Sequence, residues 1–351
     1  MPRVGKHPMK TSAYIPLPKQ RQLTMTTIVH IPELTGFWAE SLEVLTLCFQ
    51  SLFAHTSQPF DLMVFDNGSC KEVQEYLMNM QQKGFIQYLI FSHYNQRKTR
   101  AMGFLFREAP GEIIGFTDPD VYFLPGWLDA SLKVLSAFPR AGMITAMPFA
   151  VNAGSYYYEP TFHAASQDPT ISITIGDDLI PEEYILAHSI SVGVPIERYK
   201  RDRISHRQDV KISKGGVNAY AVAVDFQFLT ARSVLQEILP TWDEHAKALS
   251  EKEEEYLKGD QISIPVLEYD LDQKGFWKLS TAEYLVHHMG NRVPNLHQEL
   301  PWVEVDALNM QPQKKVAVSD NSKLISALFR STRVRNLAKK IHLTTYRWLY
   351  E

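Results

Sequence analysis

The chain has 351 residues, of which 45% are hydrophobic and 21% charged, and its formal net charge is −3 at pH 7. This length suits about two domains or one large α/β unit, and the charge gives no basis for a nucleic-acid partner. No window approaches about 20 uninterrupted apolar residues, so no membrane span is expected. The two cysteines, Cys48 and Cys70, match no metal-site spacing and no disulfide framework, which favours a cytoplasmic location.

The first third of the chain alternates between short apolar runs and segments with helical periodicity. Residues 1–23 are basic and proline-bearing, lack the apolar stretch of a signal peptide, and are predicted to form an N-terminal tail. After this tail we expect strands over residues 26–32, 60–69, 85–92 and 112–118, separated by helices over 40–56, 71–84 and 99–111. This order predicts an α/β fold with a mainly parallel, doubly wound sheet and flanking helices.

The later segments are less regular. Residues 150–215 are aromatic, polar and interrupted by prolines, and are predicted to form an insertion. A strand followed by a helix is expected over 219–238, and one helix over 251–276. The C-terminal helical extension, residues 320–351, is amphipathic and basic, with seven Lys or Arg and one Glu over 321–351.

Polar residues follow the predicted strands where those strands end. Asp66, Asn95, Asp118 and Asp120 all lie at or just after such ends. In open parallel sheets, ligands bind beyond the carboxyl ends of the strands. We therefore expect these four side chains to line a ligand site.

Asp118 and Asp120 lie one residue apart in GFTDPDVYFLPGW. Hard divalent cations prefer oxygen ligands, and Mg²⁺ or Mn²⁺ is usually held by one or two carboxylates and substrate phosphates. Such a metal would neutralise a diphosphate leaving group as a Lewis acid. Alternatively, the two aspartates cap the helix that is expected to begin near Pro125.

Three stretches resemble, in order, the family 2 glycosyltransferases that use nucleotide sugars. They are VFDNGS, GEIIGFTDPDVYFLPGWL and KGDQISIPVLEYDLDQKGF, and the resemblance covers roughly residues 25–290 except the insertion. The sequence departs from the family pattern at Arg97 and Gly103, where glycine and asparagine are usual. It also departs at Gly259, where the first member of an acidic pair is usual.

The resemblance implies a GT-A fold over residues 24–310, with a nucleotide-binding half at 24–125 and an acceptor and catalytic half at 216–310. It implies a metal, Mn²⁺ or Mg²⁺, on Asp120 and His288, with His287 as the alternate ligand. Asp260 would be the general base. Contacts to the nucleotide sugar are implied for Ile31, Pro32, Glu33, Asp66, Asn95, Arg97 and Asp118.

The implied reaction transfers a sugar from a nucleotide-diphosphate sugar to an acceptor hydroxyl, with inversion by direct displacement. Arg97 or Lys98 would help to stabilise the leaving charge. The acceptor would be a glycan, a lipid-linked compound or a small molecule. Open alternatives are a retaining GT-A transferase, a nucleotidyltransferase, and a non-catalytic module that binds sugar nucleotides or glycans. A nucleotidyltransferase is disfavoured because HIPELTGFW lacks a Gly-rich signature.

Each proposed role has a structural alternative. For Asp66, the alternative is a turn-forming role in DNGS. For Asp260, the alternative is to cap the helix that follows, and the general base would then be Glu254, Glu255, Asp243 or Glu244. A histidine can be purely structural. Tyr156, Tyr157 and Tyr158 either stack on a sugar or pack in the core. Residues 321–351 either pack on the domain, bind a partner, or lie on the inner face of a membrane as a peripheral contact.

Overall fold

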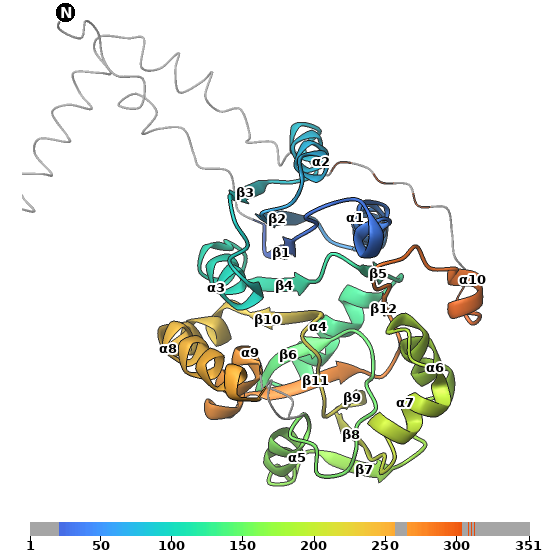
Figure 1. The fold of residues 1–351 in the computed structure, drawn as a ribbon. Helices are drawn as coiled ribbons and strands as arrows, with labels where there is room; N and C mark the ends of the chain where they lie inside the picture. The colour runs from blue at the N-terminus through green and yellow to red at the C-terminus, as the bar shows by residue number, and fades with distance from the viewer. Residues whose placement is uncertain (1–20, 257–264, 304–307, 309, 311, 313–351) are drawn as a thin grey trace, which may run out of the picture. The chain divides into compact units, whose positions relative to one another are not determined.

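The computed structural model describes residues 21–256, 265–303, 308, 310 and 312; the side chains of residues 250–256 are not described. Its first four strands are β1 (Leu23–Val29), β2 (Phe60–Asn67), β3 (Tyr88–Ser92) and β4 (Ile113–Thr117). They pair in parallel in the order β3-β2-β1-β4 (Figure 1). Every residue of β1 and β2 is buried, as expected for parallel strands with helices on both faces.

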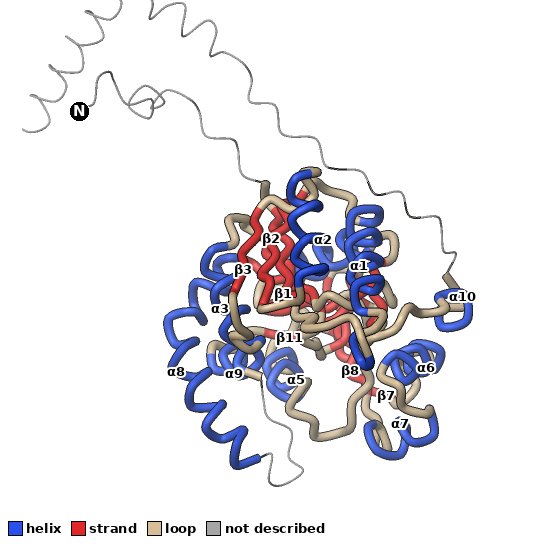
Figure 2. The backbone as a smooth tube through the Cα atoms, turned by 45° about the horizontal axis from the view of Figure 1, so that its top comes forward, coloured by secondary structure: helices blue, strands red, loops and turns tan. Residues whose placement is uncertain are grey.

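Helices cover both faces of this parallel part. α1 (Ser41–His55) and α2 (Lys71–Gln82) share a hydrophobic cluster with Met25 of β1 and Leu62 of β2. On the other face, α3 (Lys98–Glu108), α8 (Arg232–Tyr256) and α9 (Val266–Gln273) share a cluster with Phe65 and Phe116. Figure 2 shows the strands between these two groups of helices. The predicted alternation of strands and helices over residues 26–118 is therefore confirmed.

Six further strands extend the sheet to ten. They are β6 (Ala141–Thr145), β7 (Ser172–Gly176), β8 (Asp209–Lys214), β9 (Val217–Tyr220), β10 (Gln227–Ala231) and β11 (Trp277–Thr281). The full order is β3-β2-β1-β4-β10-β6-β11-β9-β8-β7. β10 is antiparallel to both β4 and β6, and β11 is parallel to β6. The α/β class is confirmed, with the parallel pairing concentrated in the first half.

Residues 150–215, the predicted insertion, carry secondary structure of their own. They contain α5 (Glu159–Ala165), α6 (Glu182–Ser191) and α7 (Ile196–Arg203), together with the edge strand β7 and its neighbour β8. Tyr158, Ile185 and Tyr199 are buried in one cluster with residues of β8, β9 and β11. A third hydrophobic cluster therefore joins this segment to the sheet.

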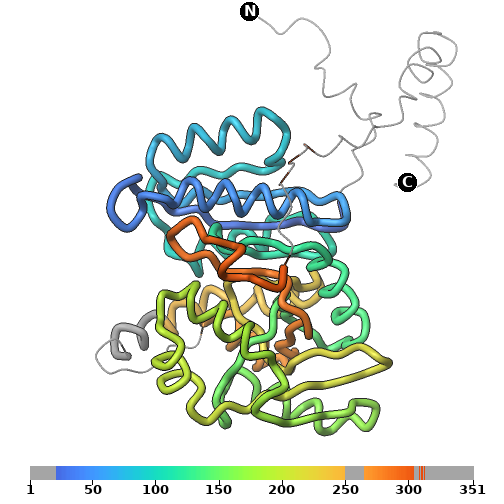
Figure 3. Tube along the Cα trace, turned by 90° about the vertical axis from the view of Figure 1, so that its right-hand side faces the viewer, coloured from blue at the N-terminus to red at the C-terminus, as the bar shows by residue number. Residues whose placement is uncertain are grey.

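A separate two-stranded sheet pairs a strand from the first half of the chain with the last strand of the described chain. β5 (Val121–Phe123) pairs antiparallel with β12 (Val286–His288), and α10 (Leu296–Glu299) follows. The segment after β12 lies beside the 3₁₀ turn Gly36–Trp38 and the start of α1 (Figure 3). Asn291 Nδ2 donates to the Phe37 carbonyl at 2.9 Å, and the Val293 amide donates to Glu40 Oε2 at 2.8 Å.

The single helix predicted for residues 251–276 is wrong in its extent. α8 already begins at Arg232 and is described to Tyr256, and α9 begins only at Val266. Pro265 is the N-cap of α9, and its ψ of 148° is extended, as is typical of a residue that precedes the first helical turn. The predicted base Asp260 lies between these helices, outside the described residues.

The chain divides into two compact units, Arg21–Gln313 and a second made of Met1–Gln20 and Lys314–Glu351. The second unit, which holds most of the predicted tail and the predicted basic helix, lies outside the described residues. Strand β1 begins at Leu23, earlier than predicted. Within the described ranges, no helix combines the length and the apolar character that crossing a bilayer requires.

Candidate active site

The Asp118-Pro119-Asp120 turn leaves the buried end of β4. The Asp118 amide donates to the Phe226 carbonyl at 2.7 Å, which ties the turn to the residue before β10. α4 (Trp127–Ala137) has Gly126 at its N-cap and no side-chain cap, so neither aspartate caps that helix. Both carboxylates are therefore available for the chemistry of the site.

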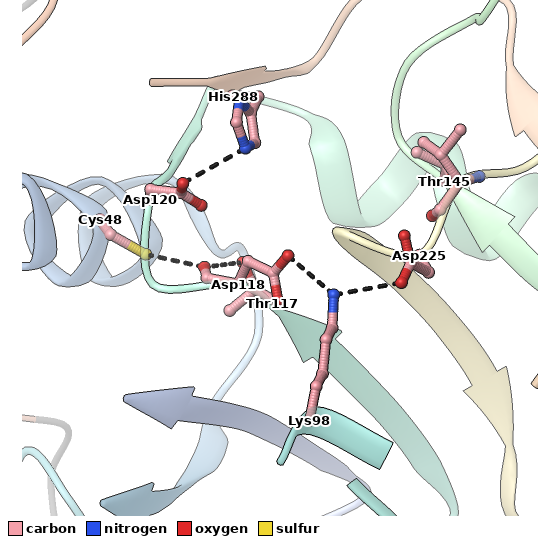
Figure 4. A network of polar contacts seen from close by, with 9 residues as sticks. Cys48, Lys98, Thr117, Asp118, Asp120, Thr145, Asp225 and His288 are labelled. Atoms are coloured by element: carbon pink, nitrogen blue, oxygen red, sulfur yellow. Dashed lines mark hydrogen bonds and ion pairs between the residues drawn. The ribbon is translucent and has the colours of Figure 1, made fainter. Parts of the chain in front are cut away.

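Lys98 joins two of the acidic side chains of the site (Figure 4). Its Nζ lies 2.9 Å from Asp118 Oδ2 and 3.1 Å from Asp225 Oδ2. Burial raises the pKa of Asp118 to about 6, although Lys98 opposes this shift. The two carboxylates raise the pKa of Lys98 against the opposing effect of burial, so its ammonium is charged at neutral pH. The result is a fixed positive charge between the ends of β4 and β10.

Asp120 faces His288 across the small sheet. His288 Nε2 lies 3.2 Å from Asp120 Oδ2, and the Met289 amide donates to the Asp120 carbonyl at 2.7 Å. Figure 4 shows the imidazole of His288 directed at this carboxylate. Burial disfavours the imidazolium, but the Asp120 carboxylate outweighs it and raises the pKa of His288.

His287 has a different environment from its neighbour. It is fully buried, with Nδ1 2.9 Å from the Tyr284 hydroxyl and Nε2 3.0 Å from Glu299 Oε2. Arg292 and the Asn295 amide contact the other oxygen of Glu299. His287 therefore holds the segment after β12 in place, and His288 is the histidine that faces Asp120.

The residues around Asp120 suit a divalent cation. Asp120 Oδ1 and His288 Nδ1 are buried and have no hydrogen-bond partner, so each side chain keeps capacity for a further ligand. Within the described ranges, no group of three or more His, Cys, Asp or Glu is arranged around a common metal position. Two protein ligands are nevertheless enough for a cation that takes its remaining oxygens from phosphate and water.

A cavity of about 630 Å³ opens beside this pair. Ile31 lines it, but Pro32 and Glu33, which were predicted with Ile31 to contact the nucleotide, are exposed and outside its wall. The lining residues come from the end of β1, the start of α1, the end of α6 and the segment after β12: His30, Ile31, Phe37, Trp38, Ser41, Val44, Pro119, Asp120, Ile190, Ser191, Val192, Gly193, His288, Met289, Gly290, Asn291 and Arg292.

Asp66 lies at the predicted strand end but is fully buried. Its Oδ1 accepts from the Ser69 amide at 3.2 Å and its Oδ2 from Gln74 Nε2 at 3.0 Å. These bonds stabilise the DNGS turn and the start of α2. In the described structure, both carboxylate oxygens of Asp66 are thus used to form the turn, which is the structural alternative to a nucleotide contact.

Asn95 and Arg97 line a second hollow, of about 1100 Å³, between α3 and α8. Asn95 Oδ1 accepts from Asn67 Nδ2 at 3.0 Å and from the Arg97 amide at 2.7 Å. Lys98 also lines this hollow, whereas Asp120 and His288 line only the first. The two hollows therefore share no lining residue.

Two acidic residues of this region were missed from sequence. Asp225, in AVDFQF, pairs with Lys98, and Glu268 of α9 lines a small cavity with both. A single acid between apolar residues was the only sequence signal for Asp225. Glu268 lies in the quoted family stretch, but nothing in its spacing marked it.

The sequence matches the family model described as glycosyl transferase family 2 over residues 38–188. The search of curated proteins found no match. The match covers less than half of the chain, and over these residues it agrees with the resemblance to family 2 glycosyltransferases. The observed order and pairing of the strands confirm the α/β class.

Several solved structures are similar to parts of the chain. A mannosyltransferase from Pyrobaculum calidifontis, in complex with GDP-Man and Mn²⁺, has 16% identity and a TM-score of 0.31, covering 37% of this chain and 36% of its own. S. aureus TarS 1–349 with UDP-GlcNAc has 14% identity and a TM-score of 0.30, covering 39% and 38%.

A third similar structure is GalNAc-T7 with UDP, GalNAc and Mn²⁺, which has 14% identity and a TM-score of 0.42, covering 76% and 43%. The chain thus spans less than half the length of these three structures. All three TM-scores are below 0.5, so the likeness to the family depends on the sequence match over residues 38–188.

Proposed function

We propose that the protein transfers a sugar from a nucleotide-diphosphate sugar to an acceptor hydroxyl, with inversion, and depends on Mn²⁺ or Mg²⁺. The carrying observation is the Asp120–His288 pair, in which Asp120 Oδ1 and His288 Nδ1 are buried without a hydrogen-bond partner. Asp120 lies two residues after Asp118, the partner of the charged Lys98. A metal at this pair would neutralise charge on the diphosphate as a Lewis acid.

The donor would occupy the 630 Å³ cavity. Its diphosphate would lie toward Asp120 and His288, and its nucleoside toward Ile31 and the Phe37–Trp38 pair, whose rings meet edge to face at 5.0 Å. Asp118 precedes the turn that carries Asp120, and it would contact the ribose or diphosphate there. Asn95 and Arg97 line the second hollow with Lys98, so they would contact the donor where it extends past Asp118 toward that hollow. Lys98 would stabilise charge that develops as the glycosidic bond breaks.

On the acceptor side, a carboxylate would take the proton of the attacking hydroxyl. The oxygen would bond to the anomeric carbon as the bond to the diphosphate breaks, and the nucleoside diphosphate would leave. Asp260 is the proposed base from the family resemblance. It borders the described structure, because α9 begins six residues after it.

The test is thermal stability against UDP, GDP, CDP and dTDP, each with and without Mn²⁺. A ligand that binds only the folded protein stabilises it by about 2.7 kcal/mol at 100 times its Kd. We expect one nucleotide to raise the melting temperature in a metal-dependent way, and Asp120→Asn to abolish the metal dependence. The exposed Asp177→Asn is the control and should behave as wild type.

Transfer assays provide the second arm. Asp260→Asn should keep the nucleotide shift and lose about 10²–10⁴-fold in turnover if it is the base. Undiminished turnover would remove Asp260 from that role. No shift with any of the four nucleotides would contradict the transferase proposal as a whole.

A further inference from the structure

Glu268 is a buried acid that the reaction above does not use. It lies in the first turn of α9 and is 1% exposed. Its Oε2 has no hydrogen-bond partner. An unpaired carboxylate oxygen in a protein interior is costly and calls for an explanation such as a water or a ligand.

Glu268 borders a cavity of about 30 Å³. This volume holds one or two groups of the size of a water molecule or a hydroxyl. Lys98 and Asp225 line the same cavity, with apolar walls from Met102, Trp242 and Val266. The second hollow shares Lys98, Trp242 and Val266 with this cavity, so the two adjoin.

The charges around this cavity favour a neutral ligand. Burial raises the pKa of Glu268 to about 8, with Asp225 adding to the shift and Lys278 and Lys98 opposing it. At neutral pH Glu268 is therefore mostly protonated, and can both donate and accept a hydrogen bond. The Lys98 ammonium in the same wall would repel a cation.

Two stacked aromatic rings lie beside Lys278, whose charge also acts on Glu268. Tyr156 and Tyr157 stack with ring centroids 4.2 Å apart, and their hydroxyl pKa values are raised mainly by burial and also by Glu268 and Asp225. Lys278 Nζ lies 5.9 Å from the centroid of Tyr156 and donates to its carbonyl at 3.2 Å. The Tyr156 hydroxyl is a second buried polar group without a partner.

We propose that Glu268, Asp225 and the Tyr156–Tyr157 pair form the acceptor subsite, and that it takes a carbohydrate. One acceptor hydroxyl would enter the small cavity between Glu268 and Asp225, and the sugar ring would lie against the tyrosines. Aromatic faces and paired hydrogen-bonding groups together suit a ring with apolar C–H faces and hydroxyl edges. This inference rests on the proposed function, because it supplies the acceptor of that transfer.

The test compares two Glu268 variants of the full chain. Glu268→Leu removes the hydrogen bond, and Glu268→Gln keeps a neutral donor and acceptor of the same shape. The readouts are transfer to methyl glycosides of glucose, galactose, mannose and N-acetylglucosamine and to glycerol, and binding of these compounds by saturation-transfer NMR.

We expect Glu268→Leu to raise the acceptor KM at least about tenfold, the loss of roughly one hydrogen bond. Nucleotide-dependent thermal shifts and donor hydrolysis by water should stay unchanged. In the wild type the acceptor KM should rise above about pH 8 as Glu268 ionises, and in Glu268→Gln it should not. The groups that face Glu268 and could alter this profile are Asp225, Lys98, Lys278 and the two tyrosines.

Asp270→Asn is the matched control. It is a second buried acid of α9, but it pairs with His245 of α8 and lines none of the cavities described above. An unchanged acceptor KM in Glu268→Leu, or an unchanged pH profile in Glu268→Gln, would overturn the proposal. So would a wild-type protein that binds none of the probes.

Sugar binding is also measured without nucleotide. Sugar binding that depends on Glu268, without any thermal shift from a nucleotide, would support the sugar subsite and contradict the transferase proposal. A thermal shift from a nucleotide, without sugar binding, would support the donor site and contradict the sugar subsite.

Discussion

Arg97 is the only non-glycine residue with positive φ in the described ranges, with φ of 63° and ψ of 162°. This backbone region is essentially restricted to glycine, and a side chain there costs about 1–3 kcal/mol. Arg97 occupies the position where the family pattern has glycine. The backbone has kept the glycine conformation, and the Arg97 amide still reaches Asn95 Oδ1.

We predict that Arg97→Gly raises the free energy of unfolding by about 1 kcal/mol, because relief of strain exceeds the entropy cost of glycine. The urea midpoint at unchanged m-value measures this. Arg100→Gly, in the first turn of α3, is the control and should lower stability by up to about 1 kcal/mol. A loss of stability in Arg97→Gly would show that the arginine side chain compensates for its backbone.

Glu268 also makes a prediction about stability. Its pKa is raised to about 8 in the folded protein, so the folded state binds more protons than the unfolded state between about pH 4.5 and 8. Its contribution to stability is therefore lost progressively as the pH rises through this window. At pH 8, Glu268→Gln should therefore be more stable than the wild type. Each kcal/mol of additional unfolding free energy would raise the Tm by about 2–4 °C. Parallel Tm curves of both proteins from pH 5 to 8 would contradict the assignment.

At the scale of elements, α3 and α8 are in close contact at Gly103. A Cβ at this position would lie 2.6 Å from Trp242 Nε1. Trp242 is 1% exposed, and its Nε1 donates to the Thr99 carbonyl at 3.3 Å, so the ring cannot easily move. This contact gives a structural reason for glycine where the family usually has asparagine.

Gly103→Ala should therefore lower the free energy of unfolding by about 1–3 kcal/mol through overpacking. The intrinsic helix propensity of alanine acts in the opposite direction by about 1 kcal/mol. Arg100→Ala, exposed on the same helix, should change stability by less than about 0.5 kcal/mol. Urea denaturation of both variants measures this difference. An increase in the stability of Gly103→Ala would contradict the prediction, and would mean that α8 can move away from α3 at little cost.

The elements that sequence predicted well are those whose signals are local. β1 to β4 and the helices between them follow from apolar runs, helical spacing and turn residues within each segment. The position of β10 between β4 and β6 follows from contacts across more than a hundred residues, such as Leu229 with Gly115, which no local pattern contains.

The same distinction holds for the site. Asp118 and Asp120 were predictable because a strand end and its turn are contiguous in sequence. The pairing of Lys98 with Asp225 spans 127 residues and depends on the antiparallel course of β10. Asp66 was correctly placed at a strand end, but sequence could not show that Ser69 and Gln74 occupy both of its carboxylate oxygens.

At the scale of the whole described unit, the candidate donor cavity depends on segments from opposite ends of the chain. Asp120 directly precedes β5 and His288 ends β12, and the segment after β12 is bound to Phe37 and Glu40. A donor in this cavity would therefore contact the start of α1, the Asp120 turn and residues 289–292 together. Binding should reduce the opening of all three segments at once, because each would gain contacts only in the closed arrangement.

Hydrogen exchange with and without the stabilising nucleotide and Mn²⁺ measures this coupling. We expect slower exchange in residues 30–44, 119–123 and 286–292, and no change in strands β7 and β8. In Asp120→Asn, residues 286–292 should lose more protection than the other two segments. The reason is that the Met289 amide and the His288 imidazole both contact Asp120. Protection confined to residues 95–100 would place the donor in the hollow between α3 and α8, and would assign the cavity at Asp120 to another ligand.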